Sequence, residues 1–169
     1  MLRSVHQKIS IDCKYLDSDI ESHILSKIKN IMTGCWSLNY GYILKVVRII
    51  KIGDNHINNA TSLVVFDVDY EIETLKPEQG LILSGKVGMV FCHGIFVVIH
   101  KIIGNKLTEL FQVLIPVKNL VNLKFDRTNK CFRSATKTIS ENDDINIKIT
   151  TAQYSDNKYI CIGNLVNNV

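Results

Sequence analysis

The chain has 169 residues, of which 46% are hydrophobic and 21% charged; this composition fits one ordinary globular domain or two small ones and excludes a disordered chain. The net charge of +4 excludes a histone-like coat of cations, so any contact with a polyanion should be local. The longest strongly apolar run, residues 89–99, is interrupted by His93 and Gly94 and is too short to span a bilayer.

Charge is divided unequally along the chain. Residues 1–78 carry nine Lys and Arg against ten Asp and Glu, whereas residues 79–169 carry eleven against six. Much of the excess in the second half lies in residues 118–137, where six cations accompany a single acid, Asp126. This division is typical of a chain that docks on protein with one half and meets a polyanion with the other.

The N-terminus and the cysteines favour an intracellular location. The N-terminus lacks the apolar core of a signal peptide. The five cysteines are widely spaced and include no C-x-x-C pair, so we expect buried apolar side chains or free thiols in the cytosol or nucleus. Ile occurs 24 times, Asn 15 times and Ala three times. This bias favours an AT-rich genome such as that of a large cytoplasmic virus, which would place the chain in host cytoplasm and in the virion.

The first half begins with a predicted strand and a predicted helix. Residues 5–13 alternate loosely and predict a strand with Ile9, Ile11 and Cys13 on one face. Ser18 and Glu21 have the spacing of a capping box, which predicts a helix over residues 18–33 that ends at Gly34. The apolar stripe of this helix would consist of Ile20, Ile24, Ile28 and Ile31.

Two strands complete the predicted N-terminal domain. Residues 41–52 are rich in Ile, Leu and Val and predict a strand, which should end in a turn or loop at residues 53–55 and 58–59. Residues 66–73 alternate strictly, which predicts one buried face and one row of four carboxylates. Cations of the earlier strand could pair with this row across the sheet. They are Lys45, Arg48 and Lys51.

A domain boundary is predicted at residues 76–80, because Pro77 cannot join a sheet ladder and Gly80 permits a sharp bend. Residues 1–78 would form an antiparallel sheet with one helix, and residues 79–169 an OB-type barrel of five strands. Its strands are predicted at residues 81–91, 94–102, 110–117, 144–151 and 158–165, with a hairpin turn at His93-Gly94. The basic stretch lies between the third and fourth of them.

No pattern in the chain predicts catalysis or a cofactor. Cys92 and His93 are adjacent and would face opposite sides of a strand, so a metal site is a poor fit. Glycine motifs for phosphate or dinucleotide binding are missing from the sequence. The carboxylates of residues 67–73 fit a solvated or partner-facing strand surface better than an acid/base pair. We therefore expect no cofactor, no metal and no small-molecule substrate.

Two features have both a structural and a functional interpretation. The basic stretch is either a solvated loop or the flank of a nucleic-acid groove on the barrel, with phenylalanines available for base stacking. The loop after the helix is either a packing plug or a protein–protein anchor, because it gathers Trp36, Leu38, Tyr40 and Tyr42. Composition alone does not separate these interpretations.

The order of several short motifs resembles the stalk subunit family of multisubunit DNA-directed RNA polymerases, which includes the seventh subunit of eukaryotic RNA polymerase II, its archaeal counterpart and a small poxvirus polymerase subunit. The resemblance covers almost the whole chain. The chain departs from the family at Ser84, where an acid is usual, and in the long loop, where no proline follows Pro116. The motifs are Gly34 followed by Tyr40 to Leu44, Pro77 with Gly80, Gly94-Ile95-Phe96, Phe125-Asp126, Lys148-Ile149 and Ile162-Gly163.

The resemblance implies a non-catalytic subunit whose N-terminal domain docks on the large polymerase subunits near the base of the clamp, with the barrel near the RNA exit path. A second small stalk subunit is a further partner in much of the family. The expected core-polymerase interface is Gly34, Trp36, Leu38, Tyr40, Gly41 and Tyr42. The expected contacts to nascent RNA are Lys86, Phe96, Lys118, Lys124, Arg127, Lys130, Arg133 and Lys148. The alternative is a free-standing OB-type protein that binds RNA or single-stranded DNA outside a polymerase.

Overall fold

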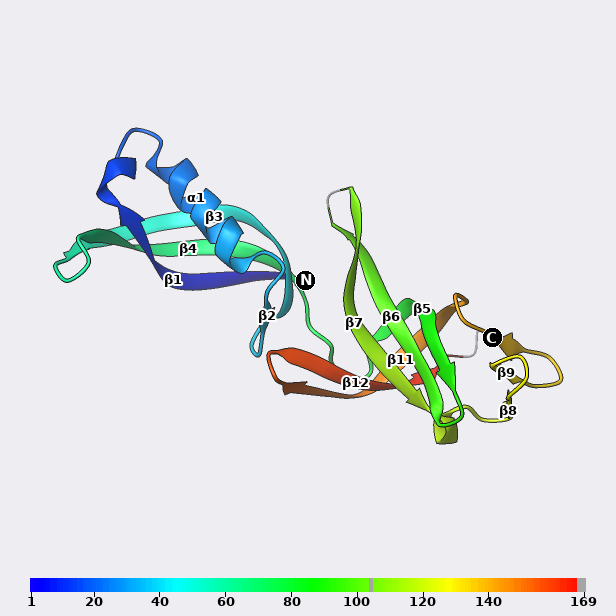
Figure 1. The fold of residues 1–169 in the computed structure, drawn as a ribbon. Helices are drawn as coiled ribbons and strands as arrows, with labels where there is room; N and C mark the ends of the chain where they lie inside the picture. The colour runs from blue at the N-terminus through cyan, green and yellow to red at the C-terminus, as the bar shows by residue number, and fades with distance from the viewer. Residues whose placement is uncertain (104, 167–169) are drawn as a thin grey trace. The chain divides into compact units, whose positions relative to one another are not determined.

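The computed structural model describes residues 1–103 and 105–166, which divide into two compact units, Met1–Lys76 and Pro77–Val169 (Figure 1). The first unit is an antiparallel sheet with a helix across one face, and the second is a closed five-stranded barrel of the OB type with a small sheet inserted into it. The predicted fold class is therefore confirmed.

The sheet of the first unit has the strand order β1-β4-β3-β2. Its strands are β1 (Leu2–Asp12), β2 (Trp36–Ser37), β3 (Gly41–Asn58) and β4 (Leu63–Leu75), and a short 3-10 helix, η1 (Cys13–Tyr15), follows β1. β4 shows the predicted alternation, since Phe66, Val68, Tyr70 and Ile72 are buried and the four carboxylates between and after them lie on the other face. Lys45 pairs with Glu73 at 3.3 Å and Arg48 with Glu71 at 3.2 Å, as predicted.

Helix α1 (Ile20–Met32) covers the apolar face of this sheet (Figure 1). Ile24 and Ile28 are fully buried against the sheet. Two details differ from the prediction. The N-cap is Asp19 rather than Ser18, so the capping box does not form, and the helix begins two residues later. Ile31 is 48% exposed, so the buried stripe does not extend through the last turn.

The ends of two predicted strands also differ from expectation. Cys13 is exposed and belongs to η1, so it does not share the buried face of Ile9 and Ile11. β3 continues through residues 53–55, where a turn was predicted, and the chain turns only after Asn58. The reason lies in the pairing of β3 with β4.

β3 follows a three-residue repeat, whereas β4 follows a two-residue one. The register shifts by one residue after each of Ile43, Val46, Ile49 and Ile52, so three residues of β3 span two residues of β4 at each step. These four side chains face the apolar core. A cation stands two positions after each of the first three, and each of these cations lies opposite an acid of β4. The intervening residues have no Cα partner on β4. They include Val47 and Ile50, which are 39% and 51% exposed.

This repeat predicts that polar substitutions at two adjacent valines change the stability of the first unit by very different amounts. Val46→Ser should destabilise the first unit by about 2 kcal/mol, because Val46 is 4% exposed and packs in the core. Val47→Ser should change stability by less than about 0.5 kcal/mol, because the bulge leaves that side chain at the surface. Urea unfolding of both variants checks this, and equal losses would contradict the observed register.

The hydroxyl of Tyr70, whose side chain lies in the core of the first unit, donates to Gln7 Oε1 at 2.6 Å. Burial of the ring, assisted by the nearby Tyr40, raises the pKa of Tyr70 to about 12. Because the folded-state pKa lies above the unfolded value of 10.0, the neutral phenol stabilises the fold below about pH 10. That stabilisation should be lost as the pH rises through about 12.

Tyr70→Phe should therefore cost about 1 kcal/mol at pH 7, because Gln7 loses its donor. Between pH 10 and pH 12, the stability of this variant should also fall less than that of the native chain. Denaturant unfolding at several pH values measures both effects. If the free energy of unfolding of the variant falls as much at alkaline pH as that of the native chain, Tyr70 is not the group responsible.

The barrel of the second unit runs in the order β11-β12-β7-β6-β5. Its strands are β5 (Ile82–Phe91), β6 (Gly94–Ile103), β7 (Lys106–Pro116), β11 (Asp144–Ser155) and β12 (Lys158–Leu165), so all five predicted strands exist and β7 begins four residues earlier than expected. The predicted turn at His93-Gly94 joins β5 to β6. Residues between β7 and β11 form η2 (Val117–Asn119) and a three-stranded sheet, β10-β9-β8, which the sequence did not predict.

Candidate protein and nucleic-acid interfaces

The aromatic loop after α1 is a short hairpin. β2 pairs with the start of β3, with Trp36 opposite Tyr42, and residues 38–40 form the turn. The two rings meet edge to face with centroids 5.0 Å apart. Gly34, at φ +81°, ends the helix as predicted, and its N–H donates to Ile43 O at 2.8 Å, which ties the hairpin to the sheet.

The hairpin uses part of its aromatic surface within its own unit. Tyr42 is 9% exposed, and Tyr40 is half-buried against the apolar core. Trp36 is half-buried, whereas Leu38, at the turn, is 60% exposed. Of the side chains predicted to dock on a partner, Leu38 and Trp36 are thus the two whose exposure suits contact with another protein.

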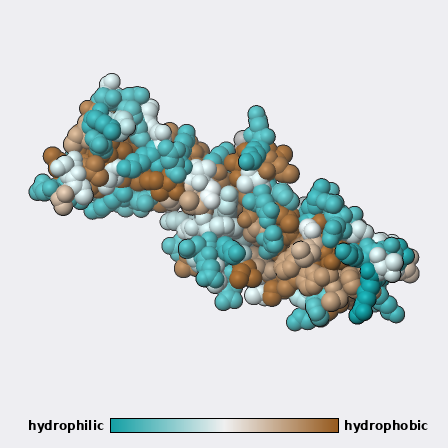
Figure 2. All heavy atoms as spheres, in the orientation of Figure 1, coloured by the Kyte–Doolittle hydropathy of each residue, from teal (hydrophilic) through white to brown (hydrophobic). Residues whose placement is uncertain are grey.

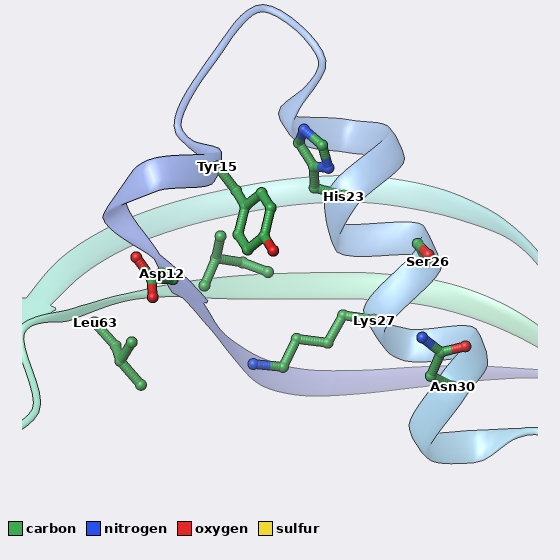
Figure 3. A pocket seen from close by; sticks show the side chains of 8 residues that line it. Asp12, Tyr15, His23, Ser26, Lys27, Asn30 and Leu63 are labelled. Carbon is green, nitrogen blue, oxygen red and sulfur yellow. The ribbon is translucent and has the colours of Figure 1, made fainter.

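A pocket of about 440 Å³ lies between α1, η1 and the end of β1 (Figure 3). Lys27 crosses from the helix to donate to Ser10 O at 2.5 Å, and His23 lies 3.3 Å from Asp17 with its ring 5.1 Å from that of Tyr15. The backbone N–H of Asp19, together with His23, holds the pKa of Asp17 below its ordinary value. These contacts fasten the helix to β1, and we assign the pocket no chemistry.

The basic stretch of the second unit runs from η2 into the inserted three-stranded sheet. Its strands are β8 (Lys124–Asp126), β9 (Cys131–Arg133) and β10 (Thr138–Ile139). Phe132 is fully buried and its ring lies 5.3 Å from that of Phe125, so the insertion has an apolar contact between its own strands β8 and β9. All six cations are exposed, and Figure 2 shows hydrophilic atoms projecting at the end of the unit that carries β8 and β9. They are Lys118, Lys124, Arg127, Lys130, Arg133 and Lys137.

Two adjoining hollows lie along this insertion. The larger, of about 670 Å³, includes Lys118 and Lys137, and the smaller, of about 450 Å³, includes Lys124 and Arg133. Asn122 and Ser134 line both hollows. Arg127 and Lys130 lie instead on the turn between β8 and β9. The insertion therefore brings together three of the predicted RNA contacts and adds Lys137, which the predicted set omitted.

The remaining predicted RNA contacts lie on barrel strands. Lys86 of β5 lies opposite Asp144 of β11 in the register of the two strands. Lys148 of β11 is opposite Asn164, which lines the larger hollow, so this cation lies beside that hollow. Phe96 stacks on Phe91, with ring centroids 5.4 Å apart and planes at 25°. The barrel strands therefore carry an aromatic pair, and their five lysines are spread one to a strand rather than gathered in one place.

The cysteines are all free thiols, as predicted; Cys131 and Cys161 are buried. Burial raises the pKa of Cys161 to about 11, which keeps this thiol protonated. Among the described residues, no group of three or more His, Cys, Asp or Glu side chains is placed to hold a metal ion. None of the helices in the described part of the chain is long and apolar enough to cross a membrane.

The sequence of the chain is similar to those of curated polymerase subunits. DNA-directed RNA polymerase II subunit RPB7 of Glycine max is 23% identical over 167 residues, which cover 95% of this chain and 89% of that protein. DNA-directed RNA polymerase II subunit 7 of Arabidopsis thaliana is 24% identical over 92 residues, 54% of this chain and 52% of that protein. No protein-family model matches the chain.

Among solved structures, the apo form of Mycoplasma genitalium RNase R matches 52% of this chain and 13% of that one with 16% identity, but the TM-score of 0.39 is too low to support an argument. The chain is similar to the stalk subunits of DNA-directed RNA polymerases, and the resemblance predicted from the sequence is confirmed. The similarity to RPB7 extends over almost the whole length of the chain.

Proposed function

We propose that this chain is the non-catalytic stalk subunit of a DNA-directed RNA polymerase. The observation that carries the proposal is the alignment with RPB7, which extends over 95% of the chain and so includes both units rather than the barrel alone. A similarity confined to the OB-type barrel would have fitted any nucleic-acid binding protein, since this barrel serves many functions. A match that also includes the sheet-and-helix unit favours assembly into the same enzyme.

In this proposal the first unit docks on the large polymerase subunits near the base of the clamp. The hairpin that carries Trp36 and Leu38 is the proposed contact, because an exposed aliphatic side chain beside an aromatic one is the usual core of a protein interface. Gly34, Tyr40, Gly41 and Tyr42 would support that contact by fixing the hairpin on the sheet. A second small stalk subunit, where the enzyme has one, is a further partner.

The second unit would lie near the path of the emerging transcript. Its inserted sheet carries exposed cations that suit a polyanion, whereas the polar face of the first unit pairs its cations with carboxylates. The chain would contribute no catalytic group and hold no cofactor. It would act inside the cell, in host cytoplasm and virion for a viral enzyme or in the nucleus for a cellular one.

Affinity purification of the tagged chain from its source cells tests the proposal. We expect the large polymerase subunits to copurify at one copy per tagged chain and to withstand a wash at high salt. A free-standing RNA-binding protein would instead elute alone or with RNA that ribonuclease removes. That outcome would overturn the proposal in favour of the alternative.

A further inference from the structure

The hairpin of β8 and β9 places two cations directly opposite each other. Lys124 pairs in register with Arg133, and both side chains are exposed. Like charges at facing positions of an antiparallel pair destabilise it by a few tenths of a kcal/mol to about 1 kcal/mol. An arrangement that weakens the fold and is relieved by a bound anion is typical of a binding site for one.

The acid beside this pair, Asp126, offsets the charge of Arg133 only in part, because most of its hydrogen bonding is with the turn. Asp126 accepts hydrogen bonds from the side chain of Asn129 at 2.8 Å and from the backbone N–H groups of Thr128 and Asn129. The side-chain bond from Asn129, followed by the backbone bonds and the charge of Arg133, holds the pKa of Asp126 below its ordinary value. This carboxylate therefore stays charged and occupied in the turn, and it is one acid beside six cations.

The two hollows extend this cationic surface from the hairpin toward η2. The residues that line them include four cations and a single acid, Asp126. The side chains of Asn122 and Ser134, which line both hollows, can donate to phosphate or sugar oxygens. Phe125 lines the smaller hollow beside Lys124, which adds an aromatic surface on which a base could stack.

We propose that the β8–β10 insertion, rather than the strand face of the barrel, binds a single-stranded polynucleotide. The phosphates would lie against Lys118 and Lys137 in the larger hollow and against Lys124 and Arg133 in the smaller one, with one base on Phe125. This inference deepens the proposed contact with RNA and rests on it for the identity of the natural strand. An acidic protein segment would suit the cations but would offer no base to stack on Phe125.

Fluorescence anisotropy with the full chain and a labelled 12-nucleotide oligouridylate tests the proposal. Each phosphate contact with a single strand contributes about 0.7 to the slope of log affinity against log salt, or about fivefold in affinity at ~0.1 M salt relative to 1 M. Lys124→Glu with Lys137→Glu should therefore weaken binding about 25-fold and reduce the slope by about 1.4. Lys106→Glu with Lys158→Glu, two exposed lysines outside the hollows, should have at most a small effect.

Stability and binding should change in opposite directions in one variant. Lys124→Glu places an acid opposite Arg133, so the second unit should melt at the same temperature as the native chain or higher while RNA affinity falls. Phe125→Leu should weaken binding at least about fivefold, the effect of one stacked base. Phe96→Leu, which alters the aromatic pair of the barrel face, should leave affinity unchanged.

Three results would overturn the inference. The first is an equal loss of RNA affinity in the hollow variants and the control variants, and the second is a loss of affinity in Phe96→Leu with none in Phe125→Leu. The third is competition by polyglutamate as strong as that by unlabelled oligouridylate. The last result would identify an acidic protein partner. Copurification of the same variants with the polymerase separates this inference from the proposed function. A variant that assembles normally but fails these binding tests rejects the RNA site and leaves the polymerase assignment intact.

Discussion

Replacing Gly41 with alanine should destabilise the first unit by about 3 kcal/mol or more. Gly41 has a φ of +77°, which costs an L-residue about 1–2 kcal/mol. A Cβ at this position would also lie 2.5 Å from Leu75 O and 2.5 Å from Lys76 Cα. Because both contacts are with backbone atoms, relieving them requires β3 and the end of β4 to separate, at a further cost of about 1–3 kcal/mol.

Gly34→Ala provides a matched control in the same hairpin. Gly34 has a similar φ of +81°, but its Cβ would meet nothing closer than the Tyr42 hydroxyl at 3.7 Å. This variant should therefore be destabilised only by the cost of a positive φ for alanine, about 1–2 kcal/mol. Trp36 is the single tryptophan of the chain, so its fluorescence during urea unfolding reports on the first unit alone. Equal losses in the two variants would show that the close approach at Gly41 does not constrain the hairpin.

Truncating the exposed end of the hairpin should weaken assembly while the fold is retained. Trp36→Ala and Leu38→Ala should each cost about 2 kcal/mol or more of association with the polymerase, as buried anchors at protein interfaces do. Ile57→Ala is the matched control, because Ile57 is 64% exposed and also lies in the first unit, whereas Leu38 is 60% exposed. Quantitative copurification at increasing salt measures the effect. If Leu38→Ala and Ile57→Ala behave alike, the hairpin is not the docking surface.

The elements that the sequence predicted best are those in which local pattern and tertiary packing agree. Strict alternation over residues 66–73 identified both faces of β4 and two of the ion pairs that cross to β3. The five barrel strands were predictable because each combines branched aliphatic residues with Gly, Asn or Asp at its ends. Gly34 was recognisable as the end of α1 because its position after the apolar repeat suits a left-handed residue.

The predictions failed where a tertiary contact overrode a local signal. Gly53-Asp54-Asn55 has the composition of a turn, yet β3 continues through it because a fourth register shift keeps the strand paired to β4. The three-residue repeat of residues 44–52 is visible in the sequence as an apolar residue, a cation and an apolar residue, but it matches neither the helical nor the ordinary strand period. The N-cap is an exception, because there one local contact prevailed over another: the N–H of Asp19 donates to Asp17, and Asp19 rather than Ser18 is the N-cap.

The candidate sites were predictable in composition but not in geometry. Six cations in residues 118–137 indicated a surface for a polyanion. That Lys124 lies opposite Arg133 depends on the register of β8 with β9, and strands of three residues are too short to show a periodicity in the sequence. The aromatic loop was recognised as a cluster. The division between Leu38 at the surface and Tyr42 in the interior follows from the short pairing of β2 with β3.

Cryo-electron microscopy of the polymerase purified through the tagged chain tests the central claim most directly. We predict density for one copy of the chain on each enzyme, attached to the large subunits through the sheet-and-helix unit, with the barrel and its β8–β10 insertion facing the exit of the transcript. Particles that lack the chain, or that hold it through the barrel with the first unit free, would contradict the account.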